Sequence, residues 1–252
     1  MSDDNSDRDR SLDLFFPGPR GNALEDAPLG VRARAALYRK VNKQNGVLSS
    51  LDRWLRTTLD QPMTSRERVV EYPYVYNHLD IDPPSSILVA GGARSPVAYT
   101  LASMGYETTV VDLDGYELSH RNLTSRAADF TDLPFDTGTF DAIISVSVIE
   151  HVGMYSEDDE RADIRAFEEL TRVLSDGGEL LFTTPFAKTY STLSNSRVYS
   201  WDRIQEAIPD EASLSEYQIY AREEEDWFPV DRDDTPEFEG TLDSVLCAKL
   251  LI

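Results

Sequence analysis

The stretch SILVAGGARSPVAYTLA, from Ser86 to Ala102, followed by ETTVVD, from Glu107 to Asp112, decides the fold of this chain. An apolar strand runs into three small residues, Gly91, Gly92 and Ala93. After a helical segment, a second apolar strand ends in the carboxylate of Asp112, 21 positions beyond Gly91. Glycine lets a backbone approach a ligand closely, and a carboxylate at a strand end can accept hydrogen bonds from both hydroxyls of a ribose. The spacing therefore predicts a β-α-β unit that binds a nucleoside-containing cofactor.

Short apolar runs alternate with helical periodicity along the rest of the chain. The expected strands are Ile87–Ala90, Thr108–Asp112, Ser125–Ala128, Ala142–Ser147, Glu179–Thr183, Ser215–Ala221 and Ser244–Leu251. The expected helices between them are Pro96–Met104, Asp163–Leu174 and Ser200–Ala207. This alternation predicts an α/β fold with a Rossmann-like, doubly wound, seven-stranded sheet. Only an acidic loop, residues 222–242, separates the last two strands, so we expect them to form an antiparallel C-terminal hairpin at the sheet edge.

The region before the sheet has a different composition. Residues 1–28 are charged and then rich in proline and glycine, which predicts an acidic, largely disordered tail. Residues 29–80 show helical periodicity and are expected to form an N-terminal helical extension or lid. Its last helix, over Ser65–Leu79, should kink at Pro73 or hold that residue in its first turn. Residues 81–252 form the expected α/β domain.

The charge of the chain limits its partners. The sequence has 46 acidic and 24 basic residues, a formal net charge of −22. Such a surface repels phosphates, so nucleic acid is not expected as a partner. Many carboxylates with few lysines are typical of a protein that works in concentrated salt, which screens self-repulsion, and we expect a halophilic archaeal source. An ordinary acidic protein is the alternative.

Cysteine content and hydropathy indicate the compartment. Cys247 is the only cysteine, so an intrachain disulfide cannot form and a thiolate metal site is not expected. The first residues are acidic, unlike a secretory signal, and no apolar run reaches the roughly 18 residues that cross a bilayer. We expect a cytoplasmic protein without a transmembrane segment, which leaves peripheral contact with a lipid-linked substrate open.

Several further motifs follow the glycine loop in a fixed order. They are Ala128-Asp129-Phe130, DLPF at Asp132–Phe135, Phe140-Asp141, EHV at Glu150–Val152, and RVLSDGGELLFTTPF from Arg172. Together with Gly91 and Asp112, these motifs resemble the class I S-adenosylmethionine-dependent methyltransferases, over residues 65–252.

The resemblance implies S-adenosylmethionine as the cofactor and no metal. The cofactor-binding residues it implies are Gly91, Gly92, Ala93, Asp112, Leu113, Asp129, Phe130, Ser145 and Val146. In this arrangement the glycine loop lies at the methionine part and Asp112 at the ribose. Asp129 would accept a hydrogen bond from the adenine amino group, while Phe130 contacts the ring.

Two positions depart from the family pattern. Val89 stands where the family has an acidic residue that helps to hold the cofactor ammonium, and Ala93 replaces the second glycine. Ala93 still permits close approach at negative φ, but Val89 removes a charged acceptor. Glu71 and Tyr72, which precede the first strand, are candidates to replace it.

His151 is the candidate catalytic residue, because an imidazole can take a proton from a hydroxyl nucleophile at neutral pH. The alternative is that Glu150 and His151 only brace the loop after the fourth strand, since a sulfonium is already a good leaving group. Aromatic residues expected around the acceptor are Tyr155, Tyr190, Tyr199, Trp201, Trp227 and Phe228.

The function predicted from these residues is methyl transfer to a hydroxyl or carboxyl of a small molecule or glycan intermediate. A nicotinamide-dependent oxidoreductase is the first alternative, although a complete G-x-G-x-x-G motif is missing. A non-catalytic Rossmann-like scaffold is the second, and Val89 is the feature that raises it.

Overall fold

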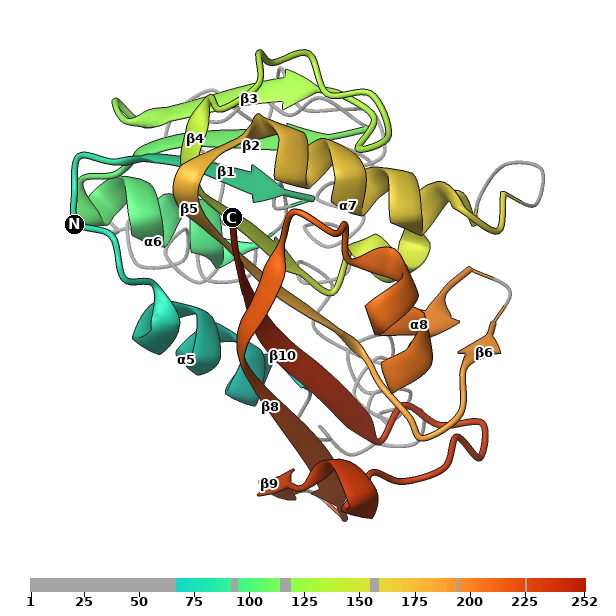
Figure 1. Ribbon diagram of the computed structural model, residues 1–252. Helices are drawn as coiled ribbons and strands as arrows, with labels where there is room; N and C mark the ends of the chain where they lie inside the picture. Colours follow the sequence, from blue (N-terminus) through green and yellow to red (C-terminus); the bar gives the residue numbers. More distant parts are fainter. Residues whose placement is uncertain (1–66, 92–94, 114–118, 155–158, 194, 225) are drawn as a thin grey trace, which may run out of the picture. The chain divides into compact units, whose positions relative to one another are not determined.

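Eight strands form one sheet in the computed structural model (Figure 1). The structure describes residues 67–91, 95–113, 119–154, 159–193, 195–224 and 226–252. The strands are β1 (Ser86–Ala90), β2 (Glu107–Asp112), β3 (Leu123–Ala127), β4 (Phe140–Val146), β5 (Leu174–Pro185), β8 (Ser213–Glu223), β9 (Asp226–Val230) and β10 (Ser244–Leu251). Their order is β3-β2-β1-β4-β5-β10-β8-β9. The first five are parallel, and β10, β8 and β9 continue the sheet in antiparallel pairs. The predicted α/β, Rossmann-like class is confirmed.

The order of the parallel strands creates a switch point between β1 and β4. From β1 the chain moves outward through β2 and β3, and it then returns to the other side of β1 with β4 and β5. Ala90, at the end of β1, is paired with Val111 on one side and with Ser145 on the other. The carboxyl ends of these three strands therefore meet at one edge, where doubly wound sheets bind their ligands.

Helices cover both faces of the sheet (Figure 1). They are α5 (Arg68–His78), α6 (Pro96–Met104), α7 (Ala162–Val173) and α8 (Trp201–Ala207), with short 3-10 turns η1 (Ile149–His151) and η2 (Arg232–Asp234). Side chains alternate along each strand, so neighbouring residues of β4 enter different cores. Ile143 packs in the core that contains Phe167 of α7, whereas Ile144 packs in the core that contains Val75 of α5 and Leu101 of α6.

Helix α6 begins and ends where its sequence predicts. The Ser95 hydroxyl caps the first turn by accepting a hydrogen bond from the Val97 N–H, and Pro96 occupies the first helical position. The helix ends at Gly105, whose φ of 106° is left-handed. This helix follows the glycine loop and so fixes the position of that loop relative to the sheet.

Helix α5 continues through Pro73, which lies in its interior and not in the first turn. Proline removes the N–H that would bond the carbonyl four residues earlier, which belongs to Val69. Val69 is 54% exposed, so water can bond that carbonyl. Although the sequence analysis assigned α5 to the helical extension, the helix packs against β4, β5 and β10 and belongs to the compact unit of residues 65–252. The predicted tail and the earlier part of the extension lie outside the described residues.

The C-terminal part of the sheet differs from the expected hairpin in two ways. Strand β10 lies between β5 and β8, and an additional strand, β9, forms the edge. Strand β9 falls within the segment that was expected to be a loop, because its acidic residues and Pro229 weaken the strand pattern. An edge strand tolerates proline, since one side of its backbone needs no partner strand. The sheet therefore has eight strands, one more than predicted.

A buried ion network joins α7 to α8. Asp163 is fully buried, and its two carboxylate oxygens accept hydrogen bonds from the Arg203 guanidinium at 2.6 and 3.1 Å. The Tyr199 hydroxyl donates to the same carboxylate at 3.0 Å, and Nε of Arg197 lies 3.6 Å from it. Two cations thus compensate one buried carboxylate, which places α8 firmly against α7.

Candidate active site

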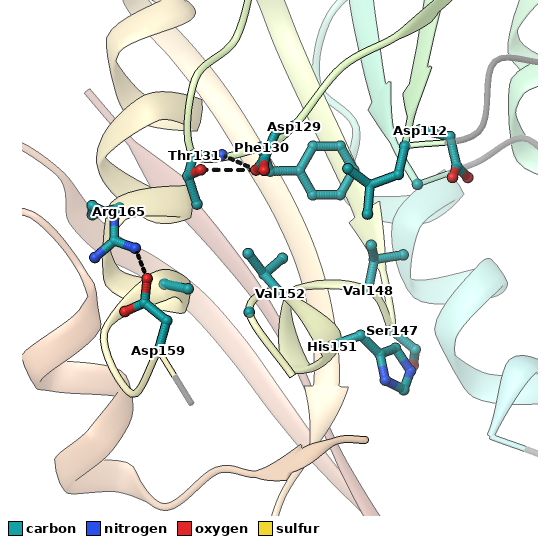
Figure 2. Close-up of a pocket in the computed structure, with 14 residues that line it drawn as sticks. Asp112, Asp129, Phe130, Thr131, Ser147, Val148, His151, Val152, Asp159 and Arg165 are labelled. Carbon is teal, nitrogen blue, oxygen red and sulfur yellow. Dashed lines mark hydrogen bonds and ion pairs between the residues drawn. The ribbon is translucent and has the colours of Figure 1, made fainter. Parts of the chain in front are cut away.

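A cavity of about 510 Å³ opens at the carboxyl edge of the parallel strands (Figure 2). Its volume is within the range of about 300–1,000 Å³ that is usual for small-molecule sites. Five of the residues predicted to bind the cofactor line it, namely Gly91, Asp112, Leu113, Asp129 and Phe130. The segment after β4 and the start of α7 complete the wall. The structure thus brings together groups that are up to 74 positions apart in the sequence, from Gly91 to Arg165.

Gly91 makes the turn from β1 into the cavity. Its φ is +74°, and its N–H donates a hydrogen bond to the Val111 carbonyl at 2.8 Å. A Cβ at this position would overlap the side chain of Val148, which lines the same cavity. Both the backbone angle and the close approach therefore require glycine. Gly92 and Ala93 lie outside the described residues.

Asp112 is the last residue of β2, and it lines the cavity (Figure 2). Its carbonyl accepts a hydrogen bond from the Ala128 N–H at 3.0 Å, which ties the end of β2 to the residue after β3. The next residue, Leu113, also lines the cavity and is 67% exposed. A carboxylate beside an exposed apolar side chain is suited to a ligand with a hydroxyl-bearing sugar next to an apolar part.

Asp129 and Phe130 form the opposite part of the same wall. Oδ1 of Asp129 accepts hydrogen bonds from the N–H and the hydroxyl of Thr131, at 2.9 and 2.8 Å. This local turn fixes the carboxylate and directs the Phe130 ring toward the cavity (Figure 2). Phe130 is 8% exposed and also packs in the core on the α7 side, so the ring is held rigidly.

The residues that border the cavity after β4 are Ser147 and Val148, in place of the predicted Ser145 and Val146. Ser145 is fully buried inside the sheet, paired with Ala90 on one side and with Phe182 on the other. Strand β4 extends to Val146, so the ligand-facing edge begins one residue later. Ser147 has a φ of +48°, and this kink turns the chain toward the cavity.

Glu71 provides a buried carboxylate behind this wall. It is fully buried, and its Oε1 accepts hydrogen bonds from the Ser147 hydroxyl at 2.6 Å and from the Thr183 hydroxyl at 2.7 Å. Arg68 forms an ion pair with its other oxygen. Val89 itself is buried in the core between sheet and helices. One hydroxyl therefore separates the Glu71 carboxylate from the cavity, while Tyr72 contacts the Ser95 hydroxyl at 3.4 Å.

His151 lies in η1 and borders the cavity next to Ser147 (Figure 2). Its Nδ1 donates a hydrogen bond to the Asn195 carbonyl at 2.5 Å, which places the proton of a neutral ring on Nδ1. Its Nε2 lies 3.9 Å from Oε1 of Glu150. The ring thus borders the cavity and also links two loops, and its catalytic role stays a prediction.

A second cavity, of about 280 Å³, adjoins the first and shares Ser147 and His151 with it. Its other lining residues are Glu67, Arg68, Glu150, Pro185, Leu193, Asn195, Ser196, Trp227, Leu242, Ser244 and Val245. Glu150 is 2% exposed, and this burial raises the pKa of its carboxyl to about 8, with a further contribution from the negative charge of Glu71. Sequence reasoning treated Glu150 only as a brace, because burial of a glutamate after a strand leaves no signal in the residue pattern.

Only Trp227, of the aromatic residues expected around the acceptor, borders either of these two cavities within the described chain. Tyr199 is part of the buried ion network. Trp201 packs against Tyr217 and under the Arg232 guanidinium, 4.5 Å from its ring centre. Phe228 is 38% exposed on the edge strand β9. Tyr190 lies near Tyr199 and borders another hollow beside α8, and Tyr155 falls outside the described residues.

Two negative findings apply to the described part of the chain. No helix in it is long and apolar enough to span a membrane. It also contains no group of three or more histidine, cysteine or acidic side chains arranged to hold a metal ion.

Comparison with known proteins relates part of this domain to methyltransferases. Residues 88–182 match the profile of a family described as "Methyltransferase domain". The glycine/sarcosine/dimethylglycine N-methyltransferase of Actinopolyspora halophila is 30% identical over 144 residues, which cover 52% of this chain but 24% of that protein. This chain therefore matches about a quarter of the relative's length.

Solved structures agree on the fold. A methyltransferase from Methanosarcina mazei superposes with a TM-score of 0.52 at 15% identity, covering 71% of this chain and 97% of that one. The N-methyltransferase NodS of Bradyrhizobium japonicum, in complex with S-adenosyl-L-homocysteine, superposes with a TM-score of 0.50 at 16% identity, covering 76% and 88%. The described α/β unit thus has the fold of these methyltransferases, and residues 88–182 within it match the methyltransferase-domain family.

The first cavity fits S-adenosylmethionine, whose product S-adenosyl-L-homocysteine is bound in NodS. A Cβ at Gly91 would fill space beside the cavity, and Asp112 lines it at the end of β2. A fixed phenylalanine ring and a fixed carboxylate, those of Phe130 and Asp129, are available for an aromatic base. These groups are of the kinds needed for a nucleoside.

Proposed function

We propose that this protein transfers the methyl group of S-adenosylmethionine to a small, polar acceptor molecule in the cytoplasm. The observation that supports the proposal is the pair of adjoining cavities that share Ser147 and His151. One cavity contains five of the predicted cofactor-binding residues, and the other contains polar side chains that a cofactor would not need. Two sites with a common wall can place a methyl donor and an acceptor in contact.

In this proposal each part of the cofactor has its own residues. Asp112 accepts hydrogen bonds from the ribose hydroxyls, and Asp129 and Phe130 bind the adenine. The loop of Gly91, Gly92 and Ala93 approaches the methionine part. The cofactor supplies an activated methyl group on a sulfonium, so the protein contributes chiefly by holding donor and nucleophile in line and by excluding water.

Glu71 compensates for Val89 in this scheme. The family's acidic residue is replaced by a buried valine, but the Glu71 carboxylate lies behind the Ser147 hydroxyl at 2.6 Å. A negative charge one hydroxyl away can still attract the cofactor ammonium through the polarised Ser147 hydroxyl. This arrangement favours an active enzyme over a non-catalytic scaffold.

Two acceptor classes follow from different observations. The sequence motifs favour a hydroxyl or carboxyl of a small molecule or glycan intermediate. The matched relative from Actinopolyspora halophila is an N-methyltransferase, and so is NodS, which raises an amine as the second candidate. Glu67, Glu71 and Glu150 lie in or next to the second cavity, so a carboxylate acceptor would be repelled there.

Calorimetric titration tests the cofactor assignment directly. S-adenosylhomocysteine should bind and NADH should not. Binding of NADH alone would support the oxidoreductase alternative, and binding of neither would support a scaffold. Incubation with methyl-labelled S-adenosylmethionine and fractionated metabolites and glycans then tests the acceptor, because label should enter small molecules or glycans and not protein.

We also propose that the protein works in concentrated salt, as its formal net charge of −22 indicates. The free energy of unfolding should rise between about 0.1 M and about 2 M KCl, because salt screens repulsion between carboxylates. An unfolding free energy that is constant or falls over that range would contradict this proposal.

A further inference from the structure

The second cavity has properties that the cofactor does not explain. We propose that it binds the methyl acceptor as a cationic amine, and that the Glu150 carboxylate takes the proton that the amine nitrogen must lose. This inference rests on the proposed function and adds to it a binding site, a substrate class and a catalytic residue.

The first argument is the unsatisfied oxygen of Glu150. The side chain lines the cavity and is 2% exposed, and among the described residues no group forms a hydrogen bond with its Oε2. A buried polar oxygen without a partner is unfavourable, and most such atoms in proteins do have one. An N–H donor of a ligand in the cavity would supply the missing hydrogen bond.

The second argument is the charge that α5 places around this carboxyl. Glu71 is fully buried and Glu67 borders the cavity, and their negative charges act on Glu150 together with the opposing positive charge of Arg68. Arg68 is the cation on this side, and it forms an ion pair with Glu71 and lies 3.5 Å from Glu67. Three carboxyl groups therefore face one guanidinium, an arrangement that favours a cationic ligand over a neutral or anionic one.

The groups on the other side of Glu150 do not cancel this charge. His151 Nε2 is 3.9 Å from Oε1, and the imidazole is bound through Nδ1 to a carbonyl oxygen. The Arg197 guanidinium donates to the Glu150 main-chain carbonyl at 3.5 Å, but its Nε faces the buried carboxylate of Asp163. The Tyr199 hydroxyl also donates to Asp163 and is neutral. The cations nearest to Glu150 are thus already paired with other acids.

The chemistry requires a base of this kind. An alkylamine binds as an ammonium and has no lone pair for attack until one proton leaves. In the proposed step that proton passes from nitrogen to Oε2 of ionised Glu150. The nitrogen lone pair then forms the N–C bond while the C–S bond breaks, and its electron pair stays on sulfur. The products are the N-methylated ammonium and S-adenosylhomocysteine, and Glu150 returns its proton to water after product release.

The pKa of about 8 suits this role. A carboxyl near its usual pKa would be too weak a base to accept a proton from an ammonium, whereas burial makes Glu150 a stronger one. Ser147 and His151 border both cavities, so a nitrogen bound at Glu150 would meet the methyl group at the boundary that these two residues form. Trp227 also borders this cavity, and the Arg222 guanidinium lies 6.0 Å from its ring centre.

The test uses the protein, labelled S-adenosylmethionine and matched acceptor pairs that differ in one group and carry no carboxylate, ethanolamine with ethylene glycol and propylamine with propanol. We expect methyl transfer to the amine of a pair and not to its hydroxyl counterpart. For the wild type, kcat/KM for the amine should rise with pH toward about 8, because kcat/KM reports the ionisation of Glu150 in the free enzyme. Glu150→Gln should lower kcat by about 100-fold or more and remove this rise, since a positioned base contributes about 10²–10⁴-fold.

Controls separate the possible failures. Glu150→Gln should bind S-adenosylhomocysteine as the wild type does, which shows that it is folded, and the exposed Glu211→Gln should retain full activity. Trp227→Ala should raise KM for the amine without changing S-adenosylhomocysteine affinity. The inference would be overturned if methyl transfer occurred only to the hydroxyl compounds, or if Glu150→Gln kept full activity. It would also be overturned if a protein that binds S-adenosylhomocysteine methylated none of the tested compounds. Failure to bind S-adenosylhomocysteine would instead contradict the proposed function.

Discussion

Replacing Glu150 by glutamine should stabilise the protein at high pH and leave its stability nearly unchanged at low pH. The carboxyl is 2% exposed, and burial raises its pKa from the usual 4.5 to about 8. Below pH 4.5 the carboxyl is protonated in both the folded and the unfolded state, so it costs nothing. Above pH 8 it is charged in both states, and the folded state must bury that charge. The wild type therefore loses stability as the pH rises from about 4.5 to about 8.

The size of the effect follows from the pKa difference. A difference of about 3.5 pKa units corresponds to about 5 kcal/mol of unfolding free energy at high pH, at about 1.4 kcal/mol per unit. Water entry and side-chain relaxation reduce this figure, so about 2–5 kcal/mol is the expected range. Glutamine has nearly the same shape and no charge, and it avoids the cost.

Urea denaturation of the wild type and of Glu150→Gln at pH 5 and at pH 9 measures this effect. The difference in unfolding free energy between the two proteins should be small at pH 5 and should favour the variant by at least about 2 kcal/mol at pH 9. Glu211→Gln is the matched control, because Glu211 is exposed and its replacement should have the same small effect at both values. If the advantage of Glu150→Gln were equal at pH 5 and pH 9, Glu150 would not be a buried carboxyl with a raised pKa.

Three other substitutions test the fold and the cofactor site. Gly91→Ala should destabilise the protein and abolish measurable S-adenosylhomocysteine binding, because the new Cβ would overlap a valine at the cavity wall. Gly177 has a similar φ of +76° but lies in open space, so Gly177→Ala should cost only the left-handed backbone energy of about 1–2 kcal/mol and leave binding intact. Equal losses of thermal stability and of S-adenosylhomocysteine affinity in the two variants would refute this reasoning. Asp112→Asn should weaken S-adenosylhomocysteine binding by about 2 kcal/mol, or about 30-fold, because a charge-assisted acceptor becomes a neutral one, and an unchanged Kd would remove Asp112 from the ribose site. Asp163→Asn should lower the unfolding free energy by about 3–5 kcal/mol, because it leaves buried cations unpaired. Glu206→Gln, which removes the exposed partner of Arg203, should lower the unfolding free energy by under about 1 kcal/mol. Equal losses in urea denaturation would contradict the buried network.

The sequence predicted the parallel half of the fold well. Strands β1, β2 and β4 are short, continuous apolar runs, as is typical of fully buried parallel strands. Gly91 directly follows β1 and Asp112 ends β2, so their places at the sheet edge could be predicted from these runs. Strand β9 was missed because edge strands need neither an apolar run nor an unbroken set of N–H donors. Local pattern is therefore a good guide to buried elements and a poor one to the sheet edge.

The site shows the same division between local and long-range information. Cofactor candidates that depend on one loop each, such as Asp129 and Phe130, lie at the cavity as predicted. Ser147 takes the place of Ser145 because strand β4 runs to Val146, which leaves Ser145 paired inside the sheet. The second cavity combines α5, η1 and the segment near β9, and no spacing rule connects residues so far apart in the chain.

The central claim is that the first cavity binds an adenosyl sulfonium cofactor. A crystal structure of the protein soaked with S-adenosylhomocysteine tests it most directly. We predict the ribose hydroxyls within about 2.6–3.2 Å of the Asp112 carboxylate and the adenine between Asp129 and Phe130. A ligand bound elsewhere, or a cavity that stays empty at saturating concentration, would contradict the account.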